Sequence, residues 1–229
     1  MTDAFDTDRV ETVLFDSYGT LVDTTAAAQA VTDLVADPEA VARDWRERAL
    51  FYSVVANDLD QYATYFDLHV DALRDALRAE GVALDDVDPR ERTAVYHDLD
   101  PFADVARCFE RLAAAGYEPS ICSNGNPEML ASLVESTGIG DSVGELVSAD
   151  DVRTLKPAAE LYEHAAERVD TPPERIAHVT AHWMDVQGAM HAGMQGVFLA
   201  RGDDLWPSFG PDPSLTVDSL AAFCDRLGA

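Results

Sequence analysis

Four polar side chains stand where an expected strand or loop leads into the next element. Asp16 follows the apolar run Val13–Phe15, Ser123 and Asp185 follow later strand-like runs, and Lys156 precedes a proline that begins a helix. Because the carboxyl ends of parallel strands meet at one edge of a sheet, we expect these side chains to lie close together. A carboxylate at that edge can act as a nucleophile, and the amides after Ser123 are suited to holding an anion.

Lys156 is the only lysine among the 16 basic residues of the chain. A compact ammonium can sit between two carboxylates and keep both ionised, which the planar fork of arginine does less readily. The pattern therefore favours a role for Lys156 between Asp16 and Asp185. The alternative is that this lysine was retained by chance.

The order of the expected elements indicates an α/β fold. Residues 23–98 carry helical patterns without a strand between them, including one helix that Asp37-Pro38 opens and another over 60–80. Beyond residue 100 strands and helices alternate, which predicts a doubly wound parallel sheet with an all-helical cap inserted after the first strand. Strands are expected at 117–122, 145–148, 176–180 and 196–200, with a loop over 201–213 and a closing helix over 219–227.

The composition limits the partners and indicates the cellular setting. The 229 residues carry 43 acidic against 16 basic groups, a net charge of -27, which disfavours nucleic acid and anionic membranes as partners. Acidic residues spread over the whole chain, with lysine almost absent, are typical of a halophilic protein. The alternative is an acidic protein from an organism that lives at ordinary salt concentration. The three separated cysteines, the lack of a leader and the lack of a long apolar segment predict a soluble cytoplasmic protein.

Four motifs in order resemble the haloacid dehalogenase superfamily, and most closely its type II L-2-haloacid dehalogenases. These are Phe15-Asp16-Ser17-Tyr18-Gly19-Thr20, the turn 123–129, Lys156-Pro157 with Tyr162, and 179–185 followed by Gly188-Ala189. The resemblance covers nearly the whole chain. It implies a Rossmann-like core of residues 1–22 and 99–229 and a helical cap of residues 23–98.

Tyr18 is the residue that separates the dehalogenases from the phosphatases of this superfamily. The phosphatases place a second aspartate there to protonate the leaving alcohol, whereas halide leaves without a proton. Asp185 also stands alone in the fourth motif, with too few oxygen ligands beside it for magnesium. The resemblance thus implies hydrolysis of short 2-haloalkanoic acids through an aspartyl ester, without a metal or other cofactor.

The resemblance also assigns the site residues. Arg46, in a Trp-Arg pair of the cap, would draw off the halide, although a surface arginine is a fair rival interpretation. For Leu50 and Tyr65 plain helix packing is the alternative to a place in the substrate pocket. The implied catalytic residues are Asp16, Thr20, Arg46, Ser123, Lys156, Tyr162 and Asp185, and the implied substrate-binding residues are Ser17, Tyr18, Leu50, Tyr65, Asn124, Thr180, His182 and Met184.

The fourth motif departs from the pattern of the dehalogenases. His182 occupies the position of a pocket asparagine, and Met184 replaces a tryptophan, with Trp183 displaced by one residue. These changes bear on the preferred substrate more than on the reaction class. The alternatives are a magnesium-dependent phosphatase of the superfamily and an inactive relative that binds small carboxylates. The sequence leaves the halogen, the chain length and the choice between monomer and homodimer open.

Overall fold

A parallel six-stranded sheet forms the centre of one half of the molecule. The structure is a computed structural model that describes residues 5–201 and 205–229. The sheet order is β3-β2-β1-β4-β5-β6, with β1 and β4 at the point where the chain reverses its direction across the sheet. This confirms the predicted doubly wound parallel sheet, and ligands of such sheets bind outside the strand ends at that reversal. The strands are β1 (Thr12–Phe15), β2 (Ser120–Ser123), β3 (Leu146–Ser148), β4 (Ile176–Thr180), β5 (Gln195–Leu199) and β6 (Leu215–Val217).

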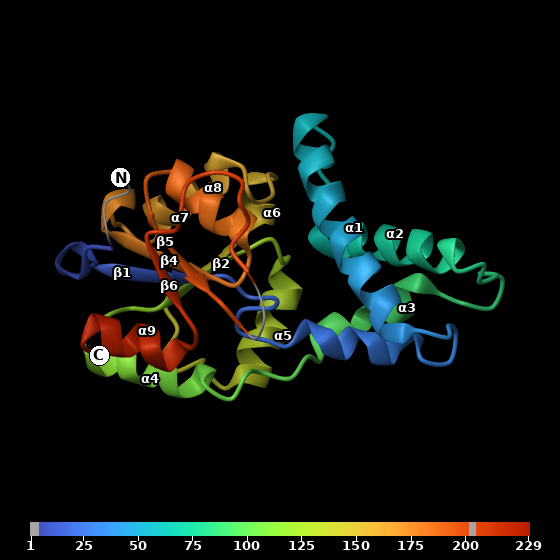
Figure 1. The fold of residues 1–229 in the computed structure, drawn as a ribbon, viewed down its shortest axis with the longest axis horizontal. Coiled ribbons are helices and arrows are strands. Elements are labelled where there is room, and N and C mark those ends of the chain that lie inside the picture. The colour runs from blue at the N-terminus through green and yellow to red at the C-terminus, as the bar shows by residue number, and fades with distance from the viewer. Residues whose placement is uncertain (1–4, 202–204) are drawn as a thin grey trace.

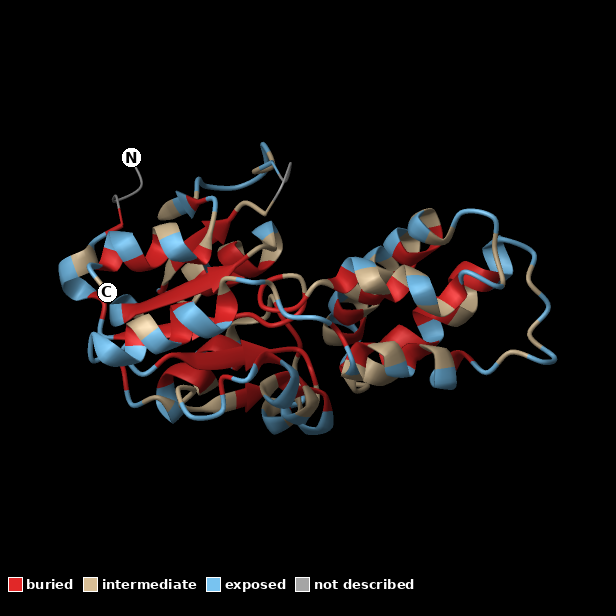
Figure 2. Cartoon of the chain, turned by 90° about the horizontal axis from the view of Figure 1, so that it is seen from below, coloured by how far each residue is buried: buried red, intermediate tan, exposed pale blue. Residues whose placement is uncertain are grey.

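Helices cover both faces of the sheet, so the strands are buried (Figures 1 and 2). On one face α4 (Val105–Ala114) lies beside α9 (Leu220–Leu227), and on the other lie α6 (Ala149–Val152), α7 (Ala159–Arg168) and α8 (Trp183–His191). Every residue of β1, β2 and β4 is buried. Strands that are buried on both faces consist mainly of apolar residues. Their sequences therefore show little alternation between apolar and polar residues.

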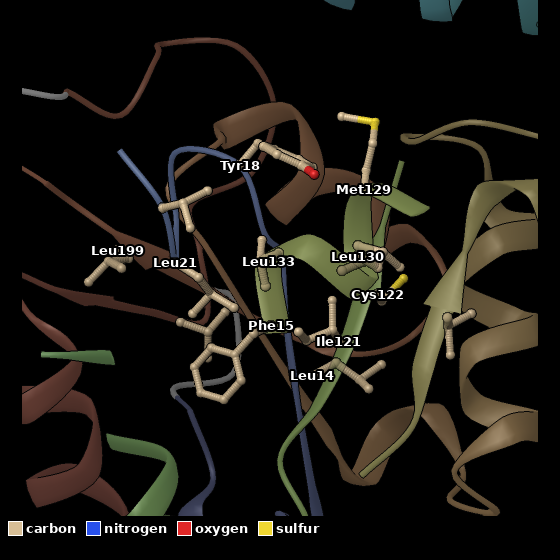
Figure 3. Close-up of a cluster of buried hydrophobic side chains, with 14 of the residues drawn as sticks. Leu14, Phe15, Tyr18, Leu21, Ile121, Cys122, Met129, Leu130, Leu133 and Leu199 are labelled. Atoms are coloured by element: carbon tan, nitrogen blue, oxygen red, sulfur yellow. The ribbon is translucent and has the colours of Figure 1, made fainter. Parts of the chain in front are cut away.

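The inner strands and α5 (Pro127–Thr137) share one part of the core (Figure 3). Leu14, Phe15 and Ile121 are fully buried there, and the ring of Phe15 lies 4.9 Å from that of Phe109. Burial of such a side chain contributes about 1.5–3 kcal/mol relative to its exposure. Asp16 follows Phe15 directly, so the packing of β1 fixes where this carboxylate stands.

A helical cap lies beside the carboxyl ends of the strands (Figures 1 and 2). Residues 23–98, all of which the structure describes, contain helices and no strand, as predicted. The Asp37 side chain caps α1 by accepting from the amide of Ala40 at 3.0 Å, and Pro38 occupies its first turn. The cap elements are η2 (Thr24–Val31), α1 (Pro38–Asp58), α2 (Tyr65–Ala79), α3 (Pro89–Thr93) and η3 (Ala94–His97).

Side-chain hydrogen bonds join the cap to the core. Near the end of α1, Asn57 Nδ2 donates to the carbonyl of Leu155 at 2.6 Å, and the Leu155 amide donates to Asn57 Oδ1 at 2.9 Å. Tyr62 donates to Asp150 of α6. Leu155 precedes Lys156, so the end of α1 is attached to the loop that carries the lysine.

Several predicted boundaries were wrong. The helix expected over 60–80 begins at Tyr65, because the Thr64 side chain accepts from the amide of Asp67 and ends the preceding loop. The sequence also predicts a helix over 24–36, which is a 3-10 helix over Thr24–Val31, and one over 186–192, which begins earlier, at Trp183. The sequence patterns did not indicate β6 or α6, which have three and four residues and are too short for a periodicity. Within the described ranges no helix is long and apolar enough to cross a membrane.

Candidate active site

Asp16 stands at the carboxyl end of β1 with both carboxylate oxygens hydrogen-bonded. Oδ1 accepts from Lys156 Nζ at 3.0 Å, and Oδ2 accepts from Thr20 Oγ1 at 2.8 Å and from Thr180 Oγ1 at 3.4 Å. The Asp16 amide donates to the carbonyl of Val179 in β4 at 3.0 Å. The residue is only 7% exposed, so its orientation is fixed while it still lines a cavity.

Lys156 lies between two carboxylates, as its isolation in the sequence suggested. Its ammonium donates to Asp16 at 3.0 Å and to Asp185 Oδ2 at 2.7 Å, and the residue is 4% exposed. Burial lowers the pKa of Lys156, but the two carboxylates outweigh burial and raise that pKa above its usual value. The lysine therefore stays charged and neutralises one of the two carboxylates.

Asp185 lies in the first turn of α8 and is surrounded by donors. Oδ1 accepts from the Tyr162 hydroxyl at 2.7 Å and from His178 Nε2 at 3.0 Å, while Oδ2 accepts from Lys156. Burial raises the pKa of Asp185, but the proximity of His178 and then of Lys156 outweighs burial, and the pKa falls well below its usual range. Asp185 is therefore an ionised carboxylate that can accept a hydrogen bond from water.

The turn after β2 forms a polar end of the site. Ser123 Oγ lies 2.6 Å from Ser17 Oγ and accepts from the Gly125 amide at 2.9 Å. Asn124 Oδ1 accepts from the Lys156 amide at 2.7 Å, which attaches this turn to the lysine loop. The turn leads into α5, whose positive N-terminal end favours an anion. This end of the site suits a substrate carboxylate.

The loop after Asp16 meets the fourth motif through a close contact. His182 Nε2 lies 3.2 Å from the carbonyl of Tyr18, and the His182 amide donates to Thr180 Oγ1 at 3.0 Å. Gly19 has φ +80°, and a Cβ on it would lie 3.2 Å from His182 Nε2, so the turn and the imidazole both require glycine there. His182 lines the cavity that opens over Asp16.

A cavity of about 280 Å³ opens over these residues between the core and the cap. Its deep end is polar, with Asp16 and Lys156, and its cap side is mostly apolar. Ten of the predicted site residues line it, which are Asp16, Tyr18, Leu50, Tyr65, Ser123, Asn124, Lys156, His182, Met184 and Asp185. Four further predicted site residues lie behind this lining and contact it through the hydrogen bonds given above. These are Thr20, Thr180, Tyr162 and Ser17.

The structure places the predicted catalytic residue Arg46 in a different hollow from this cavity. Its Nη1 donates to Thr24 Oγ1 at 3.0 Å, and the residue lines a neighbouring surface hollow with Asp23 and Arg43. The sequence pattern locates Arg46 on the correct helix of the cap. Which way its long side chain turns depends on tertiary contacts that the pattern does not specify.

The sequence patterns did not indicate several residues of the site. Glu47, Phe51 and Val54 line the cavity from α1 together with Leu50, at the spacing of one helix face, so periodicity could have indicated them. His178 contacts Asp185 from β4 and lies two residues before Thr180, on the same side of the strand. Arg201 donates to the carbonyl of Thr20 from Nε at 3.0 Å and from Nη2 at 2.8 Å, and so holds the loop after Asp16.

The fold and this arrangement of residues define a hydrolase with an aspartate at the carboxyl end of its first strand. The profile of the haloacid dehalogenase-like hydrolases matches residues 10–193, and the chain belongs to this family. Among curated relatives it is similar to (S)-2-haloacid dehalogenase 4A of Burkholderia cepacia, at 33% identity over 85% of this chain and 84% of the relative. It is also similar to (S)-2-haloacid dehalogenase 1 of Pseudomonas sp. strain CBS-3, at 31% identity over 85% and 86%.

Solved structures resemble the whole chain, including its cap. The L-2-haloacid dehalogenase of Xanthobacter autotrophicus with chloropropionic acid covalently bound superposes with a TM-score of 0.90 at 25% identity, over 96% of this chain and 99% of that one. A further dehalogenase structure superposes with a TM-score of 0.89 at 32% identity, over 97% and 99%. The relatives therefore share both the core and the inserted cap.

Proposed function

We propose that the protein is a hydrolytic dehalogenase of short 2-haloalkanoic acids that forms an ester on Asp16. The observation that carries this proposal is the pair of Asp16 and Tyr18 at the cavity. Burial, and then Tyr96, raise the pKa of the Tyr18 hydroxyl above its usual value, which makes it a poor general acid. A leaving group that needs no proton, such as halide, fits this pair better than an alcohol does.

In the first step Asp16 attacks the carbon that bears the halogen. The substrate carboxylate would lie against Ser123, Asn124 and the amides of their turn, which form the polar end of the cavity. A carboxylate oxygen of Asp16 forms a bond to the carbon, the carbon-halogen bond breaks, and halide leaves with its electron pair. Arg46 would have to exchange its hydrogen bond to Thr24 for one to the halide in order to assist.

In the second step water hydrolyses the ester. Its oxygen bonds to the carboxyl carbon of Asp16, and its proton passes to Asp185. The bond from that carbon to the alkoxy oxygen then breaks, and this oxygen takes the proton from Asp185 to give the hydroxy acid. The Asp16 carboxyl releases its remaining proton to solvent, which restores the carboxylate. Backbone amides near Ser17 and Tyr18 would stabilise the oxyanion, while Lys156 keeps Asp16 and Asp185 in place.

The remaining predictions about sites and setting belong to the same proposal. Thr20, Thr180, Tyr162 and Ser17 serve as positioning residues, supported by their hydrogen bonds to Asp16, Asp185 and Ser123. The core boundaries 1–22 and 99–229 and the cap 23–98 stay as proposed. The acidic composition and three unbridged cysteines support a reducing cytoplasm of high salt as the setting.

The proposal is tested by incubating the protein with 2-bromopropionate in molar KCl and measuring the two products, bromide and lactate. A brominated substrate is used because the chloride of the buffer would mask the release of chloride. The wild type should release both, and Asp16→Asn should release neither. Asp58→Asn removes one charge from the exposed end of α1 and should behave as the wild type. In ¹⁸O-water, mass spectrometry should find label in the peptide that contains Asp16. If several 2-haloacids yield no halide while a phosphate ester is hydrolysed, the proposal fails.

A further inference from the structure

We infer that His178 is a positioning residue for Asp185, and that it acts in the hydrolysis of the Asp16 ester. The inference rests on the proposed function, because it assigns His178 to the second step of that reaction. His178 lies in the middle of β4 and is fully buried, so it does not reach the substrate itself. It acts through Asp185, which lines the cavity.

The geometry fixes which nitrogen of His178 carries a proton. Nε2 lies 3.0 Å from Oδ1 of Asp185, and an ionised carboxylate can only accept hydrogen bonds. The proton is therefore on Nε2. The Tyr162 ring, with its centroid 5.6 Å away, stands nearly perpendicular to the imidazole at 86° and restricts its rotation. His178 and Tyr162 thus hold Oδ1 from two different elements, β4 and α7.

The hydrogen bonds of Asp185 leave a defined place for water. A carboxylate has about four lone-pair sites, two on each oxygen. Oδ1 accepts from Tyr162 and His178, and Oδ2 accepts from Lys156. The site that remains is on Oδ2, the same oxygen that contacts the ammonium bound to Asp16. Loss of the His178 donor would free a second site on Oδ1, and water could then bind Asp185 in two ways.

Among residues 5–201 and 205–229, no other hydrogen bond explains a histidine at this position. Its neighbours along β4, Ala177 and Val179, are fully buried apolar residues. A buried polar group lowers stability unless it is hydrogen-bonded. Nδ1 of His178 has no hydrogen-bond partner within the part of the chain that the structure describes, so the bond to Asp185 is its only one there. An apolar side chain could occupy this buried position of β4 equally well, but it could not donate a hydrogen bond to Asp185.

The two steps of the reaction can be separated by rapid quenching with 2-bromopropionate in excess over enzyme. His178→Phe should release one equivalent of bromide per enzyme at the wild-type rate and then turn over about tenfold more slowly, as expected for the loss of one hydrogen bond to a charged group. Mass spectrometry should detect the ester on the Asp16 peptide. His178→Gln can still donate from its amide, and should recover most of the turnover without accumulating the ester.

His69→Phe provides a matched control. His69 is also fully buried and lies in the cap, and its substitution should cause no accumulation of ester. If both steps slow equally in a folded His178→Phe variant, or if turnover is unchanged, the inference is wrong. If His178→Phe does not fold, His178→Gln decides: it must keep most of the wild-type rate of ester hydrolysis, and accumulation of the ester in this variant would make the inference wrong. Absence of halide from the wild-type enzyme would refute the proposed function instead.

Discussion

The ammonium of Lys156 lies 3.0 Å from a carboxylate oxygen of Asp16, and both residues are at least nine-tenths buried. Two buried charges in contact lose their hydration, so the pair is stable only while both partners are present. Asp185 shares the same ammonium at 2.7 Å. Two buried carboxylates therefore depend on one ammonium group.

Lys156→Met should remove activity and lower the free energy of unfolding by about 3–5 kcal/mol, because two carboxylates remain buried without a cation. Chemical denaturation at constant salt measures this loss. Lys156→Arg keeps the charge but brings a planar, larger group, so it should recover part of the stability and little activity. A Met variant as stable as the wild type would contradict the predicted dependence of both carboxylates on Lys156.

Gly188→Ala should destabilise the protein although Gly188 lies within α8. In an exposed helix this substitution stabilises by about 1 kcal/mol. Here the new Cβ would lie 2.6 Å from the Tyr162 hydroxyl and 2.9 Å from the carbonyl oxygen of Pro157, so α7 and α8 would have to separate. Overpacking of this kind costs about 1–3 kcal/mol.

The melting temperature and the turnover of Gly188→Ala should both fall, since Tyr162 also holds Asp185. Gly140→Ala is the control, because the described atom nearest to its Cβ would be in Val134 at 3.6 Å, an ordinary contact. An increased melting temperature for Gly188→Ala would show that helix propensity outweighs the contact.

His69 should make the stability depend on pH between about 6.5 and 3. Burial, and then the charge of Arg46, lower the pKa of His69 to about 3. The unfolded chain therefore binds one more proton than the native state below about pH 6.5. The stability from His69 is complete above that pH and is lost as the pH falls toward 3, by up to about 1.4 kcal/mol per pH unit.

Urea denaturation of the wild type and of His69→Phe between pH 7 and 4 measures the contribution of His69 to the pH dependence of stability. The slope of the free energy of unfolding against pH should be smaller in the variant. The difference should correspond to one bound proton, or about 1.4 kcal/mol per pH unit. His191→Gln replaces an exposed histidine and should keep the wild-type slope. Identical slopes in the wild type and His69→Phe would mean that His69 is protonated in the native state.

Dilution of salt should unfold the protein. With a net charge of -27, the native state suffers self-repulsion that ions screen within about 3 Å at 1 M salt and only within about 10 Å at 0.1 M. Circular dichroism should record loss of helix when KCl is lowered. Sucrose at equal osmolality should not replace KCl, because it is uncharged. A protein that is equally stable at both salt concentrations would be acidic without being halophilic.

The strand-end residues could be predicted because parallel strands bring their carboxyl ends together. Asp16, Ser123 and Asp185 follow from this rule, and the isolation of Lys156 in the composition indicated its partners. The contact of His178 with Asp185 joins β4 to α8 and depends on how the helix packs on the strand. The direction of Arg46 depends on a rotamer, and Thr24 rather than a sequence pattern determines it. Local periodicity contains neither kind of information.

The two hydrogen bonds between Asn57 and Leu155 have a mechanical consequence. The peptide they hold is adjacent to the one that carries the Lys156 side chain, so α1 cannot swing away as a rigid lid without pulling on the ammonium. Exchange of substrate and product must then use rotations of side chains at the rim, such as the exposed Phe51 and Trp183, on a timescale of picoseconds to nanoseconds. Opening of the cap would accompany disassembly of the charged cluster and would therefore be rare.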